Sequence, residues 1–412
     1  MSGVTVDHIV SVIIFLAAIL LFVTLFGQTI QTAVVYQENQ ATAIKCSDLL
    51  DSMLLNPGSP NYWGQSDVAP ASFGVQDPEF TEYQLSAFSL MRLSDSTGNL
   101  IEYYKTPNLC YTSVTAGAGA DLLTPNAESL NYSEALALLG INGTYGFQLS
   151  LTPDVSVAVT QTRGFSPLSL SISATGAGFP FSNAAVNYCL LLVTLGQTQA
   201  QYPSYTLLDG ATSTNQQGVA SVSFPNVTNP NQVYAFVVYA RLDGIMGVGY
   251  HTSVSESSQY VVPIVQDMGS QTVMLAHNYD LNNSNALTDS LKYNATFVIS
   301  TQDYTLNELS LSSSSQTYGT IWSGNENPVE KVTLPTCTTG ILIITYQEST
   351  TQGGVILMPW GINSLAFPIT FGGNPAMQEW VATDLRQVMI GNVAYQVKLS
   401  LWSTQNGVQV TI

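Results

Sequence analysis

The first hydrophobic pattern in the chain is an uncharged apolar run at residues 8–27. About 20 apolar residues in a helix match the thickness of a bilayer core. A cleaved signal peptide normally has a shorter apolar region, about 7–15 residues, with small residues close behind it. The nearest such site, Ala41-Thr42-Ala43, lies far beyond the run. We therefore expect a retained, single-pass transmembrane helix that follows a short cytoplasmic tail at residues 1–7.

The helical pattern continues past the apolar run. Between residues 29 and 55 apolar residues recur at helical spacing, with polar residues between them. The sequence Asn56-Pro57-Gly58-Ser59-Pro60 then stops the helix. The pattern predicts one helix from residue 8 to 55. Residues 28–60 form its amphipathic extension and its stop, and one face of the extension is expected to lie against the first globular domain.

Residues 61–158 show mixed patterns that predict a small α+β domain. Asn131-Tyr-Ser-Glu134 has the form of a capping box and predicts a short helix through Leu139, so the cap competes with the glycosylation signal at Asn131. Runs rich in apolar and aromatic residues predict three strands. These strands are Tyr83–Leu93, Leu100–Tyr104 and Tyr145–Thr160.

Alternating hydrophobic and polar positions dominate the rest of the chain, and they predict strands. Residues 159–262 predict an immunoglobulin-like β-sandwich, and the stretch Thr212–Phe224 resembles a late strand-turn-strand of bacterial and archaeal immunoglobulin-like repeats. Residues 263–412 predict a C-terminal β domain that ends in a hairpin at Gly391-Asn392 and a last strand at 408–412. The expected fold class is mainly β, with a long N-terminal transmembrane and amphipathic helix.

Charge and motifs restrict the function. The chain has a net charge of -18 and only 9 Lys and Arg residues, so it lacks the basic surface that nucleic acid requires. The sequence contains no HExxH, GxSxG or P-loop motif. We therefore expect no catalytic residues, no cofactor and no metal site, and we interpret the protein as a non-enzyme. The two carboxylates of a glycoside hydrolase can lie far apart in the sequence, so a search for short motifs does not detect them.

Four cysteines and five glycosylation signals fit an exported protein. The cysteines Cys46, Cys110, Cys189 and Cys337 form no CxxC pair, so zinc ribbons and thioredoxin chemistry are disfavoured. Export favours oxidation, and we predict a Cys46–Cys110 disulfide with Cys189 and Cys337 paired or free; four buried thiols are the alternative. The signals for glycosylation are Asn131, Asn142, Asn226, Asn282 and Asn294. They favour a short inner tail and a large extracellular C-terminal part.

The overall plan resembles two groups of proteins. A short tail, a long apolar then amphipathic helix and a β-rich head resemble type IV pilin-like proteins. The stretches 45–60, 88–93 and 139–147 resemble a group of uncharacterised archaeal membrane-anchored surface proteins. The pilin resemblance implies a buried carboxylate near the start of the helix, which Asp7 would supply. An acid that simply begins a helix is the alternative, and no Lys or Arg precedes the apolar run as it does in pilins.

The sequence leaves two functions open. The first is a structural or adhesive cell-surface protein, including a pilin-like filament subunit, whose partners are membrane lipid, other surface proteins and copies of itself. The second is a membrane-tethered protein that binds or hydrolyses extracellular polymers, with exposed tryptophans as a sugar platform. The candidates for such a platform are Trp63, Trp322, Trp360 and Trp380, and burial of these residues in the core is the alternative.

Overall fold

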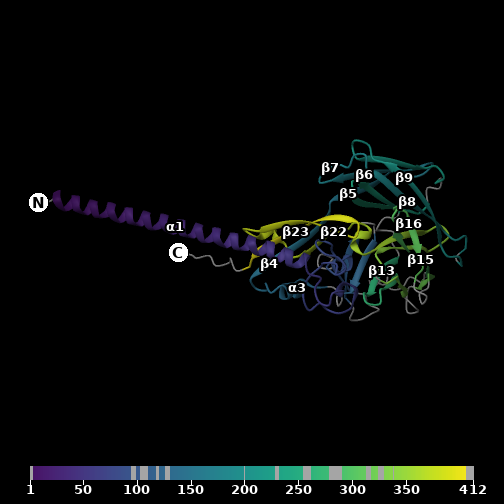
Figure 1. Ribbon diagram of the computed structural model, residues 1–412, viewed down its shortest axis with the longest axis horizontal. Helices are drawn as coiled ribbons and strands as arrows, with labels where there is room; N and C mark the ends of the chain where they lie inside the picture. Colours follow the sequence, from purple (N-terminus) through teal and green to yellow (C-terminus); the bar gives the residue numbers. More distant parts are fainter. Residues whose placement is uncertain are drawn as a thin grey trace.

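A single long helix projects from a β-rich head (Figure 1). The computed structural model describes residues 3–93, 99–102, 110–116, 120–125, 130–198, 200–227, 232–253, 261–277, 290–311, 317–322, 329–336 and 338–404. The described part is mainly β, with one long apolar helix followed by several antiparallel sheets, so the predicted fold class is confirmed.

Helix α1 (Gly3–Leu54) has 52 residues, which is about 78 Å at 1.5 Å per residue. The predicted helix is confirmed and begins five residues earlier than predicted. Its end follows from the sequence: Gly58 adopts a φ of 80°, which favours glycine. The Val75 amide donates a hydrogen bond of 2.9 Å to the carbonyl of Met53, so the end of the helix is tied to the head.

A four-stranded sheet receives the last turns of the helix. Its order is β21-β4-β23-β22, and β22 and β23 contact α1. The hairpin predicted at Gly391-Asn392 is confirmed, because Ile390 pairs with Val393 across it. The last predicted strand, 408–412, lies outside the described residues. The strands are β4 (Tyr145–Pro153), β21 (Ile369–Gly372), β22 (Ala382–Ile390) and β23 (Val393–Ser403).

Residues 155–252 form two packed sheets, β10-β6-β5 with β7, and β12-β11-β8-β9. Their facing sides enclose a separate core that includes Leu170, Ile172 and Phe236. The other side of the second sheet packs on the main core of the head, which explains why β11 is apolar almost throughout. The strands are β5 (Val155–Arg163), β6 (Leu168–Gly176), β7 (Phe179–Pro180), β8 (Ala185–Thr194), β9 (Ser204–Ser213), β10 (Val219–Phe224), β11 (Tyr234–Leu242) and β12 (Ile245–Thr252).

Two further sheets complete the head. One has the order β1-β2-β3-β13-β14-β18, and the other is β16-β15-β19-β20 with β17 on β15. The strands of the first are β1 (Asn99–Glu102), β2 (Cys110–Ala116), β3 (Ala120–Pro125), β13 (Val261–Asp267), β14 (Thr272–His277) and β18 (Val329–Thr333). The strands of the second are β15 (Ser290–Ser300), β16 (Leu306–Leu309), β17 (Tyr318–Trp322), β19 (Gly340–Gln347) and β20 (Gly353–Trp360).

The sheets do not follow the predicted division into 61–158 and 263–412. The strand β4 pairs with β21 and β23, and β3 pairs in parallel with β13. One hydrophobic cluster runs from Cys46 to Leu401 and joins these parts. Residues from both predicted domains therefore make one body, and the β-sandwich is inserted between its halves.

Three local predictions had different outcomes. The helix α3 (Tyr132–Leu138) is confirmed, with the capping box of Asn131 and Glu134 formed. The strand predicted at Tyr83–Leu93 is wrong, because Ser86 caps a short helix, α2 (Ala87–Met91), whose residues are all buried. The single strand predicted at Tyr145–Thr160 is also wrong. It divides at Asp154, and its halves, β4 and β5, enter different sheets. Single 3-10 turns lie at Trp63–Gln65, Ile362–Ser364 and Pro375–Met377.

Candidate functional site: the projecting helix and its junction with the head

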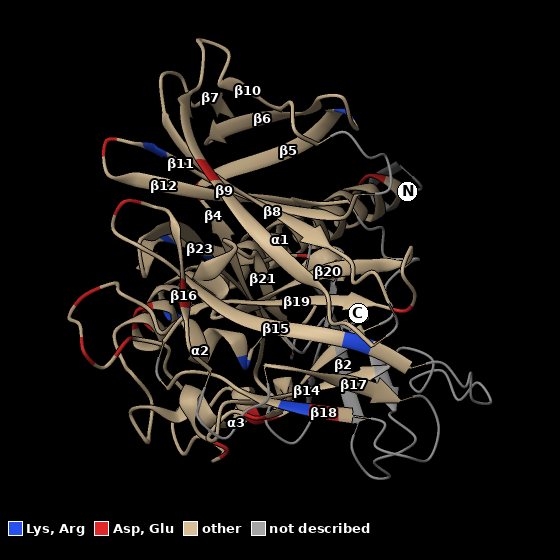
Figure 2. Ribbon diagram, turned by 90° about the vertical axis from the view of Figure 1, so that its right-hand side faces the viewer, with Lys and Arg blue, Asp and Glu red and all other residues tan. Residues whose placement is uncertain are grey.

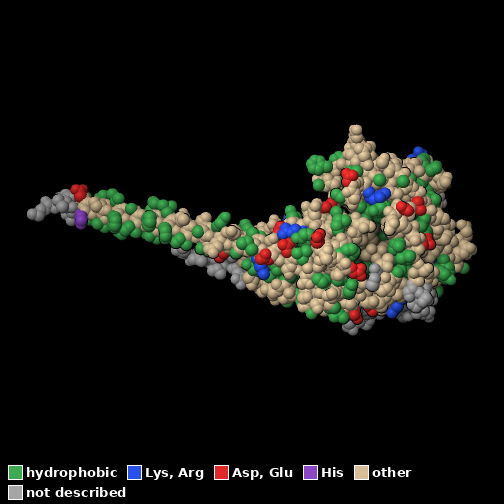
Figure 3. Space-filling view, viewed as in Figure 1, with side chains coloured by type: hydrophobic (Ala, Val, Ile, Leu, Met, Phe, Trp, Pro, Cys, Tyr) green, Lys and Arg blue, Asp and Glu red, His purple; other side chains and the backbone are tan. Residues whose placement is uncertain are grey.

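The outer part of α1 is apolar and fully exposed. Within it an 18-residue window has a mean hydropathy of 3.1, and none of that window is buried. Its length and composition make it a candidate membrane span. Figure 3 shows its hydrophobic surface reaching far from the head, with an acidic side chain and a histidine at its outer tip and the other charged side chains on or near the head. Large side chains point outward all round the helix; Phe15 is 66% exposed and Phe22 is 68% exposed.

The helix becomes amphipathic where it reaches the head. Thr42 and Cys46 are the first side chains of α1 to be buried, and Leu50 and Met53 are completely buried. Ile44, on the opposite side, stays 57% exposed. Residues at a spacing of three or four lie on one helix face, so this pattern seats the last turns against β22 and β23. The helix extension was predicted to lie against the first globular domain, but it packs on β22 and β23 from the end of the chain, because its apolar face completes the core under that sheet. Val75 and Tyr83 of the first region add single hydrogen bonds.

Arg386 of β22 fixes this junction through charged contacts. Its Nε lies 3.1 Å from Asp51 Oδ1 of the helix, and its Nη1 lies 2.6 Å from Asp384 Oδ1. Its Nη2 donates to Ser47 Oγ at 3.1 Å, and Tyr83 Oη donates to Asp51 at 3.2 Å. The hydrogen bond with Asp51 raises the pKa of Arg386. This network sets the rotation of the helix on the head, while the apolar contacts supply most of the stability.

Asp384 makes the junction sensitive to strong acid. Burial raises its pKa, but hydrogen bonds from Ser47 and Arg386 outweigh burial, so the pKa lies below the ordinary value of 3.8. A carboxyl whose pKa is lowered by folding stabilises the protein while it is ionised. That contribution is lost as the pH falls through the lowered pKa, and it persists at every pH above 3.8.

Cys46 lies inside this junction as a free thiol. Its Sγ is 3.6 Å from the carbonyl oxygen of Leu399 and 3.7 Å from that of Ala382. The predicted Cys46–Cys110 disulfide is therefore wrong: the helix turns Cys46 toward β22 and β23. Cys110 begins β2, and its side chain lies outside the described residues, as does Cys337. Cys189 is a second free and buried thiol.

We expect both free thiols to resist alkylation in the native protein. Burial raises the pKa of Cys46 to about 11, and burial also raises that of Cys189. Because the thiolate is the reacting form, iodoacetamide in mildly alkaline buffer leaves both unmodified, and unfolding in urea exposes them. Mass spectrometry of the two cysteine peptides measures this. Rapid labelling of Cys46 without denaturant, or its recovery in a disulfide, would contradict the structure.

The predicted glycosylation positions lie in different settings. Asn131, Asn142 and Asn226 are exposed, and Asn131 also caps α3. Asn294 is half-buried in β15, where its amide donates to the carbonyl of Pro203 at 3.3 Å. Asn282 lies outside the described residues. Three of the five positions are thus on the surface, and the modification itself stays a prediction.

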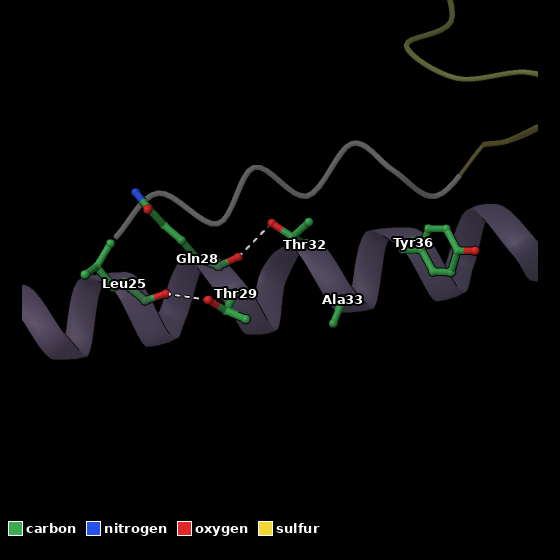
Figure 4. A pocket seen from close by; sticks show the side chains of 6 residues that line it. All are labelled: Leu25, Gln28, Thr29, Thr32, Ala33 and Tyr36. Carbon is green, nitrogen blue, oxygen red and sulfur yellow. Dashed lines mark hydrogen bonds between the residues drawn. The ribbon is translucent and has the colours of Figure 1, made fainter.

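Residues 28–41 of the helix lie between the apolar run and the head and contain both apolar and polar side chains; we call this segment the neck. Its two threonine hydroxyls are satisfied within the helix: Thr29 donates to the carbonyl of Leu25 at 2.9 Å, and Thr32 to that of Gln28 at 2.8 Å. Figure 4 shows these residues with Ala33 and Tyr36 beside an open hollow on one side of the helix. At 100° per residue, Asp7 lies on the same side as Leu25 and Thr32.

The four tryptophans proposed for a sugar platform do not lie together. Trp63 and Trp360 are completely buried in the core. Trp322 and Trp380 are 45% and 37% exposed, and Trp322 shares an outward strand face with Tyr318. Sequence reasoning missed Tyr318 and the contact of Arg386 with the helix. The alternation Asp384-Leu-Arg386 was a signal for the second, because it places both charges on one face of a strand.

No protein-family model matches the chain. No curated protein sequence matches it either. Among solved structures, the chain is similar to trypsin-activated alpha-2-macroglobulin from Escherichia coli, with a TM-score of 0.21 and 8% identity, over 57% of this chain and 18% of that one. It is similar to invasin, a bacterial integrin-binding protein, with a TM-score of 0.15 and 11% identity, over 60% of this chain and 54% of that one. Likeness at this level carries no functional argument.

Proposed function

We propose that the chain is a non-enzymatic, membrane-anchored cell-surface protein that associates laterally through its N-terminal helix. In this proposal residues 8–27 cross the membrane once and the head lies outside the cell. The association builds either a filament core or a cluster in the membrane. The resemblance to pilin-like proteins and to archaeal surface proteins supports this assignment.

The observation that carries the proposal is that the exposed helix is longer than a membrane span requires. The helix projects from residue 3 to 41 before the first buried side chain, which is about 58 Å at 1.5 Å per residue. A bilayer core takes about 20 residues. The neck at residues 28–41 then adds roughly 21 Å in which Ile30, Val34 and Tyr36 remain exposed, Tyr36 by 71%. Apolar surface of this kind favours burial against another helix.

Features at both ends of the helix are compatible with side-by-side packing of the helices of neighbouring subunits. Its first turns contain Asp7, whose carboxylate is costly inside an apolar layer without a partner, by about 2.5–3.5 kcal/mol on insertion scales. A neighbouring subunit would supply that partner. At the other end, the Arg386 network holds the head at a fixed rotation on the helix, so that helix contacts would order the heads.

Crosslinking of single cysteines tests this proposal. The background carries alanine in place of the four native cysteines, and cysteines are introduced one at a time at exposed positions between residues 12 and 26 in native membranes. Packed helices give disulfide-linked dimers with a helical periodicity, strongest on one face. The matched control is Gln217→Cys, which lies in an exposed turn of the sandwich, far from the helix. If no helix position exceeds this control, the chain is a solitary anchor.

The polymer-binding alternative is favoured by a separate observation on the head. Trp322 and Tyr318 stand exposed on β17, with a lysine and a further tyrosine beside them. These side chains can stack on a polymer and form hydrogen bonds with it, so the observation favours the binding form of this alternative.

A further inference from the structure

The outward face of strands β15 and β17 carries an ordered row of aromatic and polar side chains. Along β17 the side chains alternate: Gly319 and Ile321 are buried, while Tyr318 and Trp322 are 56% and 45% exposed. Thr320 lies between the two rings on the same side. Four residues along a strand cover about 13 Å, so the rings stand at the two ends of a short platform.

A parallel row of polar side chains lies beside these rings on β15. The register pairs Ser290 with Trp322, Lys292 with Thr320, and Asn294 with Tyr318. All three β15 residues are half-buried, because they alternate with core residues of the same strand. Directly opposed side chains on neighbouring strands lie about 5 Å apart. Each aromatic or hydroxyl group of β17 therefore has a polar neighbour from β15.

Tyr202, from the segment before β9, completes the platform. Its ring centroid lies 4.9 Å from that of Tyr318, with the rings tilted by 50°, and it is 38% exposed. The ammonium group of Lys292 lies 5.1 Å from the Tyr202 ring centroid and donates to Thr320 Oγ1 at 2.8 Å. Lys292 is thus held at the centre by a cation–π contact and one hydrogen bond. Figure 2 shows the blue segment of β15 on the face of the head that lies opposite the helix.

The chemistry of this platform fits a saccharide. A pyranose ring has apolar C–H faces that stack on aromatic rings and a rim of hydroxyl groups that need hydrogen-bonding partners. The platform offers three rings with amphipathic edges, next to a hydroxyl, an amide and an ammonium group. The fully buried core of a protein interface is more uniformly apolar and poor in charged groups. The alternation of ring and polar group therefore favours a sugar chain over a protein surface.

The charge of Lys292 selects among saccharides. Lys292 supplies the positive charge of this face, and its ammonium group is held there by the Tyr202 ring and by Thr320 Oγ1. An ammonium group binds a carboxylate through charge-assisted hydrogen bonds, which are stronger than neutral ones. We propose that the face formed by Tyr202, Lys292, Tyr318, Thr320 and Trp322 binds an acidic polysaccharide of the uronic-acid type. This inference does not depend on association through the helix.

Affinity electrophoresis of the full chain in detergent tests the proposal. Gels contain alginate as the acidic probe or dextran as the neutral one. Wild-type protein is retarded by alginate, and its retardation by dextran is at least tenfold weaker. Trp322→Ala and Tyr318→Ala each raise the dissociation constant for alginate at least tenfold, and Lys292→Met removes the preference for alginate over dextran. Trp322→Phe keeps a ring and retains most of the affinity, which separates stacking from a folding defect.

Matched controls address general effects of charge and of exposed rings. Lys331→Met removes an exposed lysine from β18 that is not one of the five residues of the platform, and it leaves binding unchanged. Phe179→Ala removes a ring that is 74% exposed on the sandwich, and it too has no effect. Absence of retardation by alginate, or equal retardation of wild type and Trp322→Ala, overturns the proposal. So does a concentration-dependent dimer that Trp322→Ala abolishes, because the face would then bind a second copy.

Discussion

Leu50→Ala is expected to lower the free energy of unfolding of the head by about 2–5 kcal/mol. Leu50 is completely buried where α1 meets β22 and β23, and it belongs to the same cluster as Leu399. Truncation removes its transfer free energy and leaves a cavity, because strands on one side and the helix on the other limit collapse. Urea unfolding in detergent, followed by intrinsic fluorescence, measures the change.

The matched control is Ile44→Ala on the same helix. Ile44 is 57% exposed, so its truncation changes the free energy of unfolding by less than about 0.5 kcal/mol. Cys46 provides a second readout, since Leu50→Ala loosens the junction around its thiol and accelerates its alkylation relative to Ile44→Ala. Equal effects of the two substitutions would mean that the helix end is not part of the core of the head.

The double substitution Leu16→Lys with Leu20→Lys is expected to release the protein from the membrane. Both residues lie near the middle of the apolar run and are 53% and 68% exposed on the helix. A lysine at the centre of a membrane helix costs about 2.5–3.5 kcal/mol on insertion scales, so the pair costs roughly 5–7 kcal/mol. At 1.4 kcal/mol per factor of ten, this lowers the ratio of inserted to non-inserted protein by roughly four to five orders of magnitude.

Alkaline extraction and flotation of membranes measure this release. Wild-type protein stays with the lipid, and the double variant moves to the soluble or aggregated fraction. Phe179→Lys is the control, because it adds the same charge at a residue that is 74% exposed on the head. Mass spectrometry of the wild-type N-terminus completes the test. A wild-type chain that begins near Ala43 and is already soluble would contradict the anchor.

Local sequence carried enough information for elements with a strong and regular signal. The helix was predictable because an uncharged run, a helical spacing and a Pro-Gly stop agree from residue 8 to 60. The capping box at Asn131 and the hairpin at Gly391-Asn392 were predictable because each depends on contacts within a few residues. The strand predicted at Tyr83–Leu93 failed because its central segment is short and buried. At Ala87–Met91 an apolar run has no periodicity that distinguishes a helix from a strand.

For the candidate site, too, local properties were predictable from the sequence and contacts between distant residues were not. The sequence by itself determined that α1 is long, apolar and uncharged over a span that matches a bilayer, because these properties need no partner. Only the tertiary structure decided that Asp51 meets Arg386, 335 residues later, and that Cys46 lies against β22 and β23 instead of pairing with Cys110. The tertiary structure also places the ring of Tyr202 in contact with the ring of Tyr318. Pairing between distant strands depends on the sum of many weak contacts, and no single local pattern encodes which strands will meet.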